Sequence, residues 1–237
     1  TARWRGDKTF GGFQPIALMQ YSDFDTDANR VKGQRIYGEA GVTYPMNWTW
    51  GFLRTTAKYR SVAYDLENLR GLPEEKPDAS SGLFSIDGGL LFERATSLGG
   101  QSMSQTLEPR VFYLYSGYDE QRDQPVFDAA ELTFSYNQLF RDTRFSGHDR
   151  LDDANQVSVG VTTRFFADSD GRERLNASIG QIFYFRDREV RLNALGPIID
   201  ESLSATAVEF NWFPTNSWSI RSSMLYDTED NEFDALS

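Results

Sequence analysis

His148 is the only histidine in the 237-residue chain, and it lies in the polar segment Ser146-Gly147-His148-Asp149. A serine or histidine nucleophile system would have to use this imidazole, because such catalysis needs a base that is hydrogen-bonded to the nucleophile. Ser146 and Asp149 are neighbours of His148 in sequence, which does not by itself provide that geometry. We therefore interpret His148 as a loop histidine and predict no catalytic residue.

Clustered carboxylates offer a second type of chemistry, cation binding. Alternating aspartates can bind Ca²⁺ through their oxygens, although such aspartates are more often turn formers on a solvated surface. The absence of cysteine and the single histidine argue against a zinc site, and no glycine-rich nucleotide-binding spacing is present. We predict no metal ligand and no cofactor, with calcium binding as the alternative. The acidic clusters are Asp23, Asp25 and Asp27; Asp168 and Asp170; and Asp227, Glu229, Asp230 and Glu232.

Basic side chains repeat at every second or fourth position in one segment. Arg54, Lys58 and Arg60 alternate there with apolar residues, which puts the three cations on one face of an extended strand. That face does not suit lipid, since Arg or Lys at the midplane of a bilayer costs about 2 to 4 kcal/mol. We expect it to line water, where the cations serve either lumen hydration or contact with phosphate groups.

The elements that position these residues follow a period of two. Leu175, Ile179 and Phe183 share one face of a run whose other face carries Asn176 and Ser178, and alternation of this kind predicts a β-strand. The mean hydropathy is −0.53, and no apolar stretch is long enough for a transmembrane helix. Barrel strands of about 10 residues avoid that requirement, because only alternate side chains meet lipid.

Ten strands are predicted in this way, joined as an antiparallel meander. They span residues 2–6, 11–22, 32–44, 49–65, 82–94, 104–118, 156–166, 173–186, 204–213 and 218–228.

The connections between these strands alternate between short and long. Short turns rich in Pro, Asn, Asp and Gly are expected near 45–48, 167–172 and 214–217, and long charged loops near 65–81, 119–155 and 187–203. Short periplasmic turns and long extracellular loops are typical of an outer-membrane barrel. We therefore predict an all-β, antiparallel transmembrane β-barrel segment over residues 1–237.

Charge and sheet edges limit the remaining classes. The net charge of −11 argues against nucleic acid as a partner, because phosphate binding normally needs a basic patch. An open sheet facing lipid would leave edge backbone groups without hydrogen bonds. Since no closing strand is evident and the chain starts without an initiator methionine, we predict an internal piece of a larger barrel.

Four ordered motifs resemble the LptD family of lipopolysaccharide (LPS) assembly proteins. They are QTLEPRVFYLY (residues 105–115), the loop motif LFRD with FSGHDR and ANQ (139–142, 145–150 and 154–156), VGVTTR (159–164) and SIGQIFYF (178–185).

The resemblance implies a barrel of roughly 26 strands, at the upper end of the single-chain range. It also implies the outer membrane of a Gram-negative bacterium, LPS and outer-membrane lipids as ligands, the lipoprotein LptE as plug, and the bridge protein LptA as a partner of a separate N-terminal domain. None of the matched motifs is catalytic, so the family adds no active-site residue. A passive porin and, less favoured, a barrel enzyme such as a phospholipase remain the alternatives.

Charged residues within the motifs are candidates for a structural role. Glu108 and Arg110 share the inward face of one predicted strand, and the long loop carries Arg141, Asp142, Asp149 and Arg150. We expect these four to form an ion-pair network that folds the loop over or into the barrel. The hypothesis is that this loop holds the plug or shapes the lumen.

Overall fold

The computed structural model describes residues 1–6, 11–25, 30–67, 69, 71–215, 217–227 and 232–236. Within this part of the chain the secondary structure consists of twelve β-strands and one short 3₁₀-helix, η1 (Tyr136–Phe140). None of the described residues lies in a helix with the length and apolar character that a membrane span requires. The strands are β1 (Ala2–Arg5), β2 (Gln14–Phe24), β3 (Gly33–Trp48), β4 (Gly51–Leu66), β5 (Asp78–Leu90), β6 (Phe92–Leu98), β7 (Gln101–Ser116), β8 (Ala154–Ala167), β9 (Glu173–Tyr184), β10 (Thr206–Trp212), β11 (Ile220–Asp227) and β12 (Glu232–Leu236).

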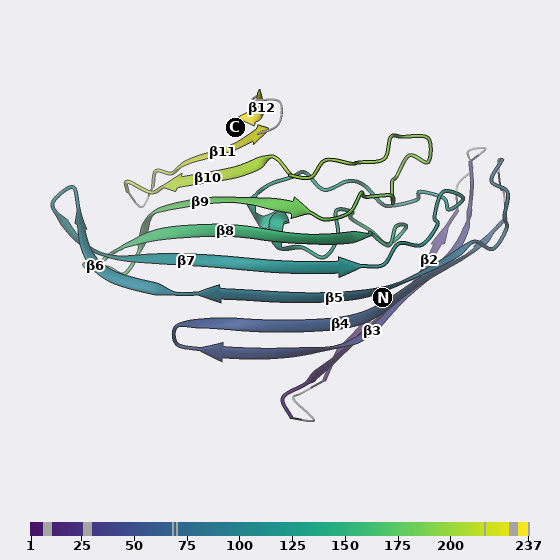
Figure 1. Cartoon of the computed structure of the whole chain (residues 1–237), viewed down its shortest axis with the longest axis horizontal. Coiled ribbons are helices and arrows are strands. Elements are labelled where there is room, and N and C mark those ends of the chain that lie inside the picture. Colours follow the sequence, from purple (N-terminus) through teal and green to yellow (C-terminus); the bar gives the residue numbers. More distant parts are fainter. Residues whose placement is uncertain are drawn as a thin grey trace.

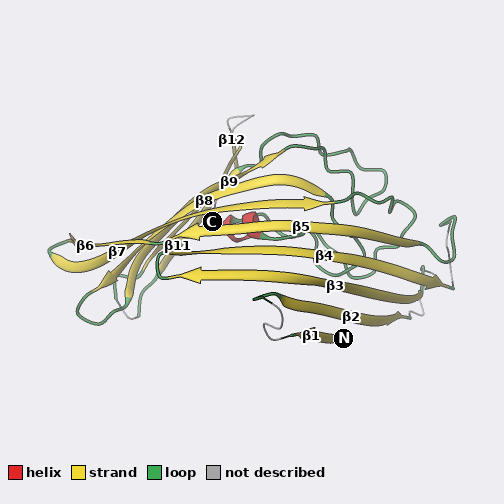
Figure 2. Ribbon diagram, turned by 60° about the horizontal axis from the view of Figure 1, so that its bottom comes forward, coloured by secondary structure: helices red, strands yellow, loops and turns green. Residues whose placement is uncertain are grey.

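All twelve strands belong to one antiparallel sheet. Each strand pairs with its neighbours in sequence, except that β5 pairs with β7 beside the short β6, which also pairs with β7. β1 and β12 lie at opposite edges, so the described sheet is open. Figures 1 and 2 show a long, curved and twisted sheet with the short turns at one end and the longer loops at the other. The prediction of an incomplete antiparallel barrel segment is confirmed, with twelve strands rather than ten.

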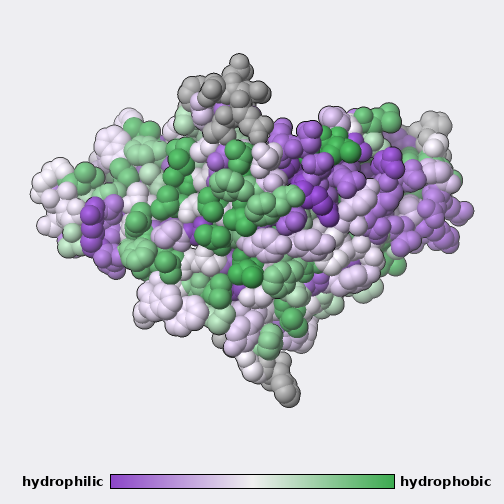
Figure 3. Space-filling view, viewed as in Figure 1, coloured by the Kyte–Doolittle hydropathy of each residue, from purple (hydrophilic) through white to green (hydrophobic). Residues whose placement is uncertain are grey.

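The two faces of the sheet differ in polarity, as strand alternation requires. The outer face exposes large apolar side chains in register across successive strands, whereas the inner face buries polar and charged side chains, such as Arg35, Arg60 and Asp87, among apolar ones. An exposed apolar face opposite a face that buries charged side chains is typical of a membrane barrel, whereas a soluble sandwich packs its apolar face inside. The exposed outer residues include Ile36, Tyr59, Ile86, Val111, Val159, Ile179 and Phe210. Figure 3 shows apolar side chains over the middle of the strands and hydrophilic ones toward the end that carries the long loops.

The first short turn lies later in the chain than the sequence predicts. Residues 45–48 belong to β3, in which Pro45 pairs with Arg54, and the chain reverses at residues 49–50. A proline is tolerated there because pairing of β3 with β2 ends at Thr43, so at Pro45 the strand has a paired neighbour on one side only. Regular alternation on both sides of Pro45 did not reveal the turn position.

Pro109 lies where the partner strand along one edge of β7 changes from β5 to β6. Pairing of β5 with β7 ends at Gly89 opposite Arg110, and pairing of β6 begins at Phe92 opposite Leu107. The predicted single strand over residues 82–94 is therefore two strands separated by Leu91, whose N–H donates to the Trp50 carbonyl rather than to β7. A proline has no N–H to lose at such a break. The hairpin from β6 to β7 then turns at Gly99 and Gly100, whose φ angles are 59° and 80°, as expected for a tight hairpin turn.

Short and long connections occupy opposite ends of the described sheet. The short ones span residues 49–50, 99–100, 168–172 and 213–219, and the long ones include 67–77, 117–153 and 185–205. The assignment of the short end to the periplasm stays a prediction. The strand β12 was not predicted, and the acidic residues 229 and 230 lie outside the described residues.

Candidate functional site

The connection between β7 and β8, residues 117–153, is called the inward loop here because it packs against the inner face of the sheet. Its helix η1 contacts β8, β9 and β10, and Figure 2 shows the helix within the curve of the sheet, about midway along the strands. Tyr136 and Leu139 of η1 are buried. The segment that carries the LFRD and GHDR motifs is therefore part of the interior.

Two glycines on the barrel wall make room for η1. Gly160 and Gly180 pair across β8 and β9. A Cβ atom at Gly160 would come within 2.9 Å of the Phe140 and Tyr136 rings, and one at Gly180 within 2.6 Å of Leu139. These distances are shorter than van der Waals contact, so only glycine leaves the socket open. The glycines of the VGVTTR and SIGQIFYF motifs thus have a structural role that their strand positions did not reveal.

Asp149 anchors the far end of the inward loop to β3 and β4. Its carboxylate pairs with the fully buried Arg35 and accepts a hydrogen bond of 3.1 Å from the Tyr64 hydroxyl. The same carboxylate accepts backbone N–H groups from residues 127–129 at 2.8 to 3.0 Å. Arg35 also pairs with Asp128 at 2.6 Å. The buried Asp149 carboxylate is therefore both ion-paired and hydrogen-bonded, as a buried charge must be to remain ionised.

His148 stacks on Tyr37 of β3, with ring centroids 3.9 Å apart and planes inclined by 7°. Burial and the positive charge of Arg35 lower the pKa of the imidazole below its ordinary value. The hydroxyl of Ser146 is hydrogen-bonded to the backbone N–H and C=O of Ala130 rather than to His148. The arrangement positions a loop and does not assemble a nucleophile with its base.

Lys58 and Arg60 of β4 bind the inward loop at two different points, Asp142 and Asp152. Lys58 pairs with Asp142 at 2.7 Å and with Glu39 at 3.1 Å. Partial burial raises the pKa of the Asp142 carboxyl, but the charge and hydrogen bond of Lys58 outweigh this and hold the pKa below its ordinary value. Arg60 donates to the Ser116 hydroxyl at 2.7 Å and to the Asp152 carbonyl at 3.0 Å. Two of the three predicted lumen cations therefore hold the loop.

Asp152 binds Arg144 within the inward loop, and its neighbour Asp153 joins that loop to the β9–β10 loop, residues 185–205. Asp152 accepts two hydrogen bonds from the Arg144 guanidinium at 2.7 and 3.1 Å. Asp153 accepts the backbone N–H groups of Glu189 and Val190, both at 3.0 Å, and pairs with Arg186 at 3.1 Å. The two long loops are therefore fastened to one another as well as to the wall.

Arg110 and Glu108 lie on the inner face of β7, as predicted, but form separate pairs. Arg110 makes a bidentate ion pair with Asp87 at 2.8 and 2.9 Å, and its guanidinium lies 4.1 Å from the centre of the Phe140 ring. Glu108 pairs with Arg164 of β8 at 3.2 Å. Arg54 reaches Asp87 only at 3.8 Å and is half exposed. Strand β7, which carries the QTLEPR motif, thus contacts η1 through Arg110 and Phe140.

The four charged loop residues do not form one network. Asp142 binds Lys58 and Asp149 binds Arg35, whereas Arg150 donates to backbone carbonyls. Arg141 is exposed and makes no ion pair with another described residue. The loop does fold inward, but each charge uses its own partner. Sequence reasoning missed Arg35, although it alternates with Ile36 in a predicted strand and that spacing signals an inward cation.

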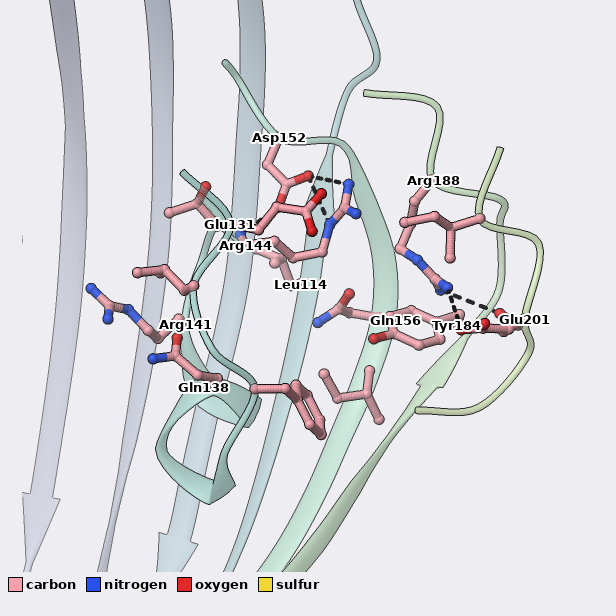
Figure 4. A pocket seen from close by; sticks show the side chains of 15 residues that line it. Leu114, Glu131, Gln138, Arg141, Arg144, Asp152, Gln156, Tyr184, Arg188 and Glu201 are labelled. Atoms are coloured by element: carbon pink, nitrogen blue, oxygen red, sulfur yellow. Dashed lines mark hydrogen bonds and ion pairs between the residues drawn. The ribbon is translucent and has the colours of Figure 1, made fainter. Parts of the chain in front are cut away.

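A cavity of about 200 Å³ lies between the inward loop, the wall and the β9–β10 loop. Figure 4 shows the Arg144–Asp152 pair on one side of it and Arg188 reaching toward Glu201 on the other. Arg188 also lies over the Tyr184 ring at 3.5 Å. Within the described residues, no three side chains of His, Cys, Asp or Glu gather as a metal site would need.

Comparison with known proteins gives consistent results. The whole chain, residues 1–237, matches the family described as LptD, LPS transport system D. It is 39% identical to the LPS-assembly protein LptD of Ectopseudomonas mendocina over 87% of the chain and 24% of that protein. The corresponding identity is 47% for the protein of Pseudomonas aeruginosa strain LESB58, over 70% and 19%. It is 37% for that of Hahella chejuensis, over 93% and 29%. The chain thus spans less than a third of the length of these relatives.

Proposed function

Because the chain belongs to the LptD family, we propose that it is an internal part of the wall of an outer-membrane translocon that inserts LPS into the outer leaflet. The chain is an all-β segment of an outer-membrane barrel in a Gram-negative bacterium. The proposal assigns it no covalent chemistry: the wall and its inward loop shape a path.

The position of the family motifs in the structure supports this proposal. The motifs that resemble the family all meet at the docked inward loop: Arg110 under Phe140, Gly160 and Gly180 around η1, and Asp149 on Arg35. The inward loop occupies part of the lumen, whereas a passive porin needs an open pore. This packing therefore supports a translocon over a passive porin. Buried ion pairs of this type stabilise one specific arrangement more than they add net stability.

The partners belong to the same proposal. We assign the lipoprotein LptE to the lumen as a plug, next to the inward loop, and LptA to an N-terminal domain of the full-length protein. The polar inner face and its ion pairs support a hydrated lumen. Lys58 and Arg60 then serve the loop, while the half-exposed Arg54 faces water.

Depletion of the full-length parent protein in cells tests the transport function. We expect newly made LPS to accumulate inside the cell and surface labelling to fall before general barrel assembly fails. Unchanged surface delivery would reject the translocon and favour a solute channel.

Deletion of residues 137–153 in the full-length protein tests the role of the loop. Retention of the plug should decrease and sensitivity of the cells to detergent should increase. If both remain as in the wild type, the loop neither holds the plug nor shapes the lumen.

A further inference from the structure

A second, larger cavity lies at the end of the sheet that carries the long loops. Its volume is about 770 Å³, within the range of roughly 300 to 1,000 Å³ that is usual for ligand pockets. The end of β2, the inward loop and the β9–β10 loop meet there. Phe24, Gln124, Phe127 and Arg150 line the cavity, together with Asp23 and Asp25.

Arg150 gives the cavity a buried positive charge without a carboxylate partner. The residue is 4% exposed. Its guanidinium donates to the carbonyls of Gln124, Pro125 and Arg191 at 2.9 to 3.1 Å, and forms no ion pair among the described residues. Carbonyls satisfy the donors but do not neutralise the charge, and burial lowers the pKa of the group accordingly. An anion in the cavity would supply the missing countercharge.

Gln124 is the second and independent observation. Its side chain lines the cavity and the residue is 4% exposed, yet neither the amide nitrogen nor the amide oxygen has a hydrogen-bond partner among the described residues. A buried carboxamide without partners costs roughly 1 to 3 kcal/mol. Such a group is explained when a ligand supplies an acceptor for the N–H₂ and a donor for the C=O.

The remaining wall suits a sugar ring. Phe24 and Phe127 stack on one another with centroids 4.2 Å apart, and the partly exposed edges of the two rings give the cavity an apolar wall for C–H groups of a pyranose. The carboxylates of Asp23 and Asp25 can accept hydrogen bonds from hydroxyl groups. The cavity is also too large for a lone phosphate ion.

We propose that this cavity binds a phosphorylated sugar, with the phosphate toward Arg150 and the Gln124 amide bridging phosphate and hydroxyl groups. Either a free sugar phosphate or the phosphorylated saccharide of a glycolipid has this chemistry. In the second case the site deepens the proposed function and rests on it; in the first it is independent of transport.

Calorimetric titration of the purified full-length protein tests the site. Glucose 6-phosphate should bind at least tenfold more tightly than glucose or inorganic phosphate. Gln124→Leu should weaken glucose 6-phosphate about tenfold, as expected for a lost hydrogen bond to a charged group, and Gln124→Glu should abolish binding. Because the Gln124 amide makes no bond to the protein, neither variant removes a contact of the fold. Gln138→Leu, in the smaller cavity, is the matched control and should bind like the wild type.

Several results would overturn the site. They are the absence of binding, equal affinity for inorganic phosphate and glucose 6-phosphate, and unaltered affinity of Gln124→Leu. Competition by LPS but not by dephosphorylated LPS assigns the group to a glycolipid, and no competition assigns it to a free sugar phosphate. Binding that persists although depletion leaves LPS delivery intact would reject the proposed function alone.

Discussion

Arg35 of β3 and Asp149 of the inward loop form an ion pair in which neither side chain is exposed, although 114 positions separate them in sequence. The pair closes the loop onto the wall after the chain has passed through four further strands and η1. Breaking a buried pair by removing one partner costs far more than the pair itself contributes, because a bare charge stays behind. The contact therefore specifies one position of the loop.

Substitution of Arg35 tests this anchor. Arg35→Met leaves the Asp149 carboxylate buried without its cation, which should cost about 3 to 5 kcal/mol of local stability. Hydrogen exchange of the backbone amides of residues 127–129, which donate to that carboxylate, should then accelerate in the full-length protein. Lys76→Met removes the exposed pair with Asp65 and should leave these amides unchanged. Equal protection in wild type and Arg35→Met would contradict the anchor.

The glycine socket makes a steric prediction. Gly160→Ala places a methyl group within 2.9 Å of the Phe140 and Tyr136 rings, and overpacking of this type costs about 1 to 3 kcal/mol. We expect trypsin to cleave the full-length protein after Arg141 or Arg144 about tenfold faster as η1 leaves the wall. Gly82→Ala, where the added Cβ meets no atom within 4 Å, is the control. The socket is rejected if both variants resist trypsin equally.

Acidification should loosen the loop through His148. Burial and Arg35 hold the pKa of the imidazole below its ordinary value of about 6.5. The unfolded loop therefore binds a proton more readily, so the docked state loses stability as the pH falls through about 6.5. The depressed carboxyl pKa of Asp142 acts only at lower pH. The protection factors of the amides of residues 144–150, which are the intrinsic exchange rates at each pH divided by the observed rates, should be smaller at acidic than at neutral pH.

His148→Phe is the control for that titration. Phenylalanine preserves the stack on Tyr37 and cannot take up a proton. The difference in protection factor between neutral and mildly acidic pH should disappear in this variant. A difference that stays the same would assign the pH dependence to another group.

Lys58 and Asp142 allow a charge-reversal experiment. Lys58→Glu places a carboxylate opposite Asp142, with which Lys58 pairs at 2.7 Å, and should increase the sensitivity of cells to large antibiotics. Asp142→Lys in the same protein restores opposite charges and should recover most of the barrier. Arg54→Glu, at a half-exposed position on the same strand, should have a smaller effect. Failure of the double variant to recover would indicate that the two side chains do not act as a pair.

Coupling between the two long loops depends on Asp153. Asp153→Ala removes the acceptor of the Glu189 and Val190 amides and the partner of Arg186. These two amides should exchange faster, while those of residues 127–129, held by Asp149, should not. If both sets respond together, the loops open as one unit rather than through this contact.

Local sequence predicted most of the sheet, because alternation is a property of neighbouring residues. Ile179 and Phe183 point outward and Ser158 and Thr162 inward as expected from period two. The positions of breaks were harder to predict. Pro45 lies within a strand because β2 has already ended beside it, and Pro109 lies opposite the junction of β5 and β6. Both depend on where a neighbouring strand stops, which is not local information.

The sequence by itself therefore determined the strand faces, the open antiparallel sheet and, through its motifs, the family. Only the tertiary structure decided that the loop folds inward and which charges meet. Many basic residues in the sequence carry the charge that Asp142 and Asp149 need in a partner. Which of them lies within ion-pair distance depends on how the loop and the strands are placed in space. The role of Gly160 and Gly180 was likewise hidden, since a socket exists only once the rings of Tyr136 and Phe140 lie on it. Pairing and packing are long-range, and hydrophobic alternation carries no information about them.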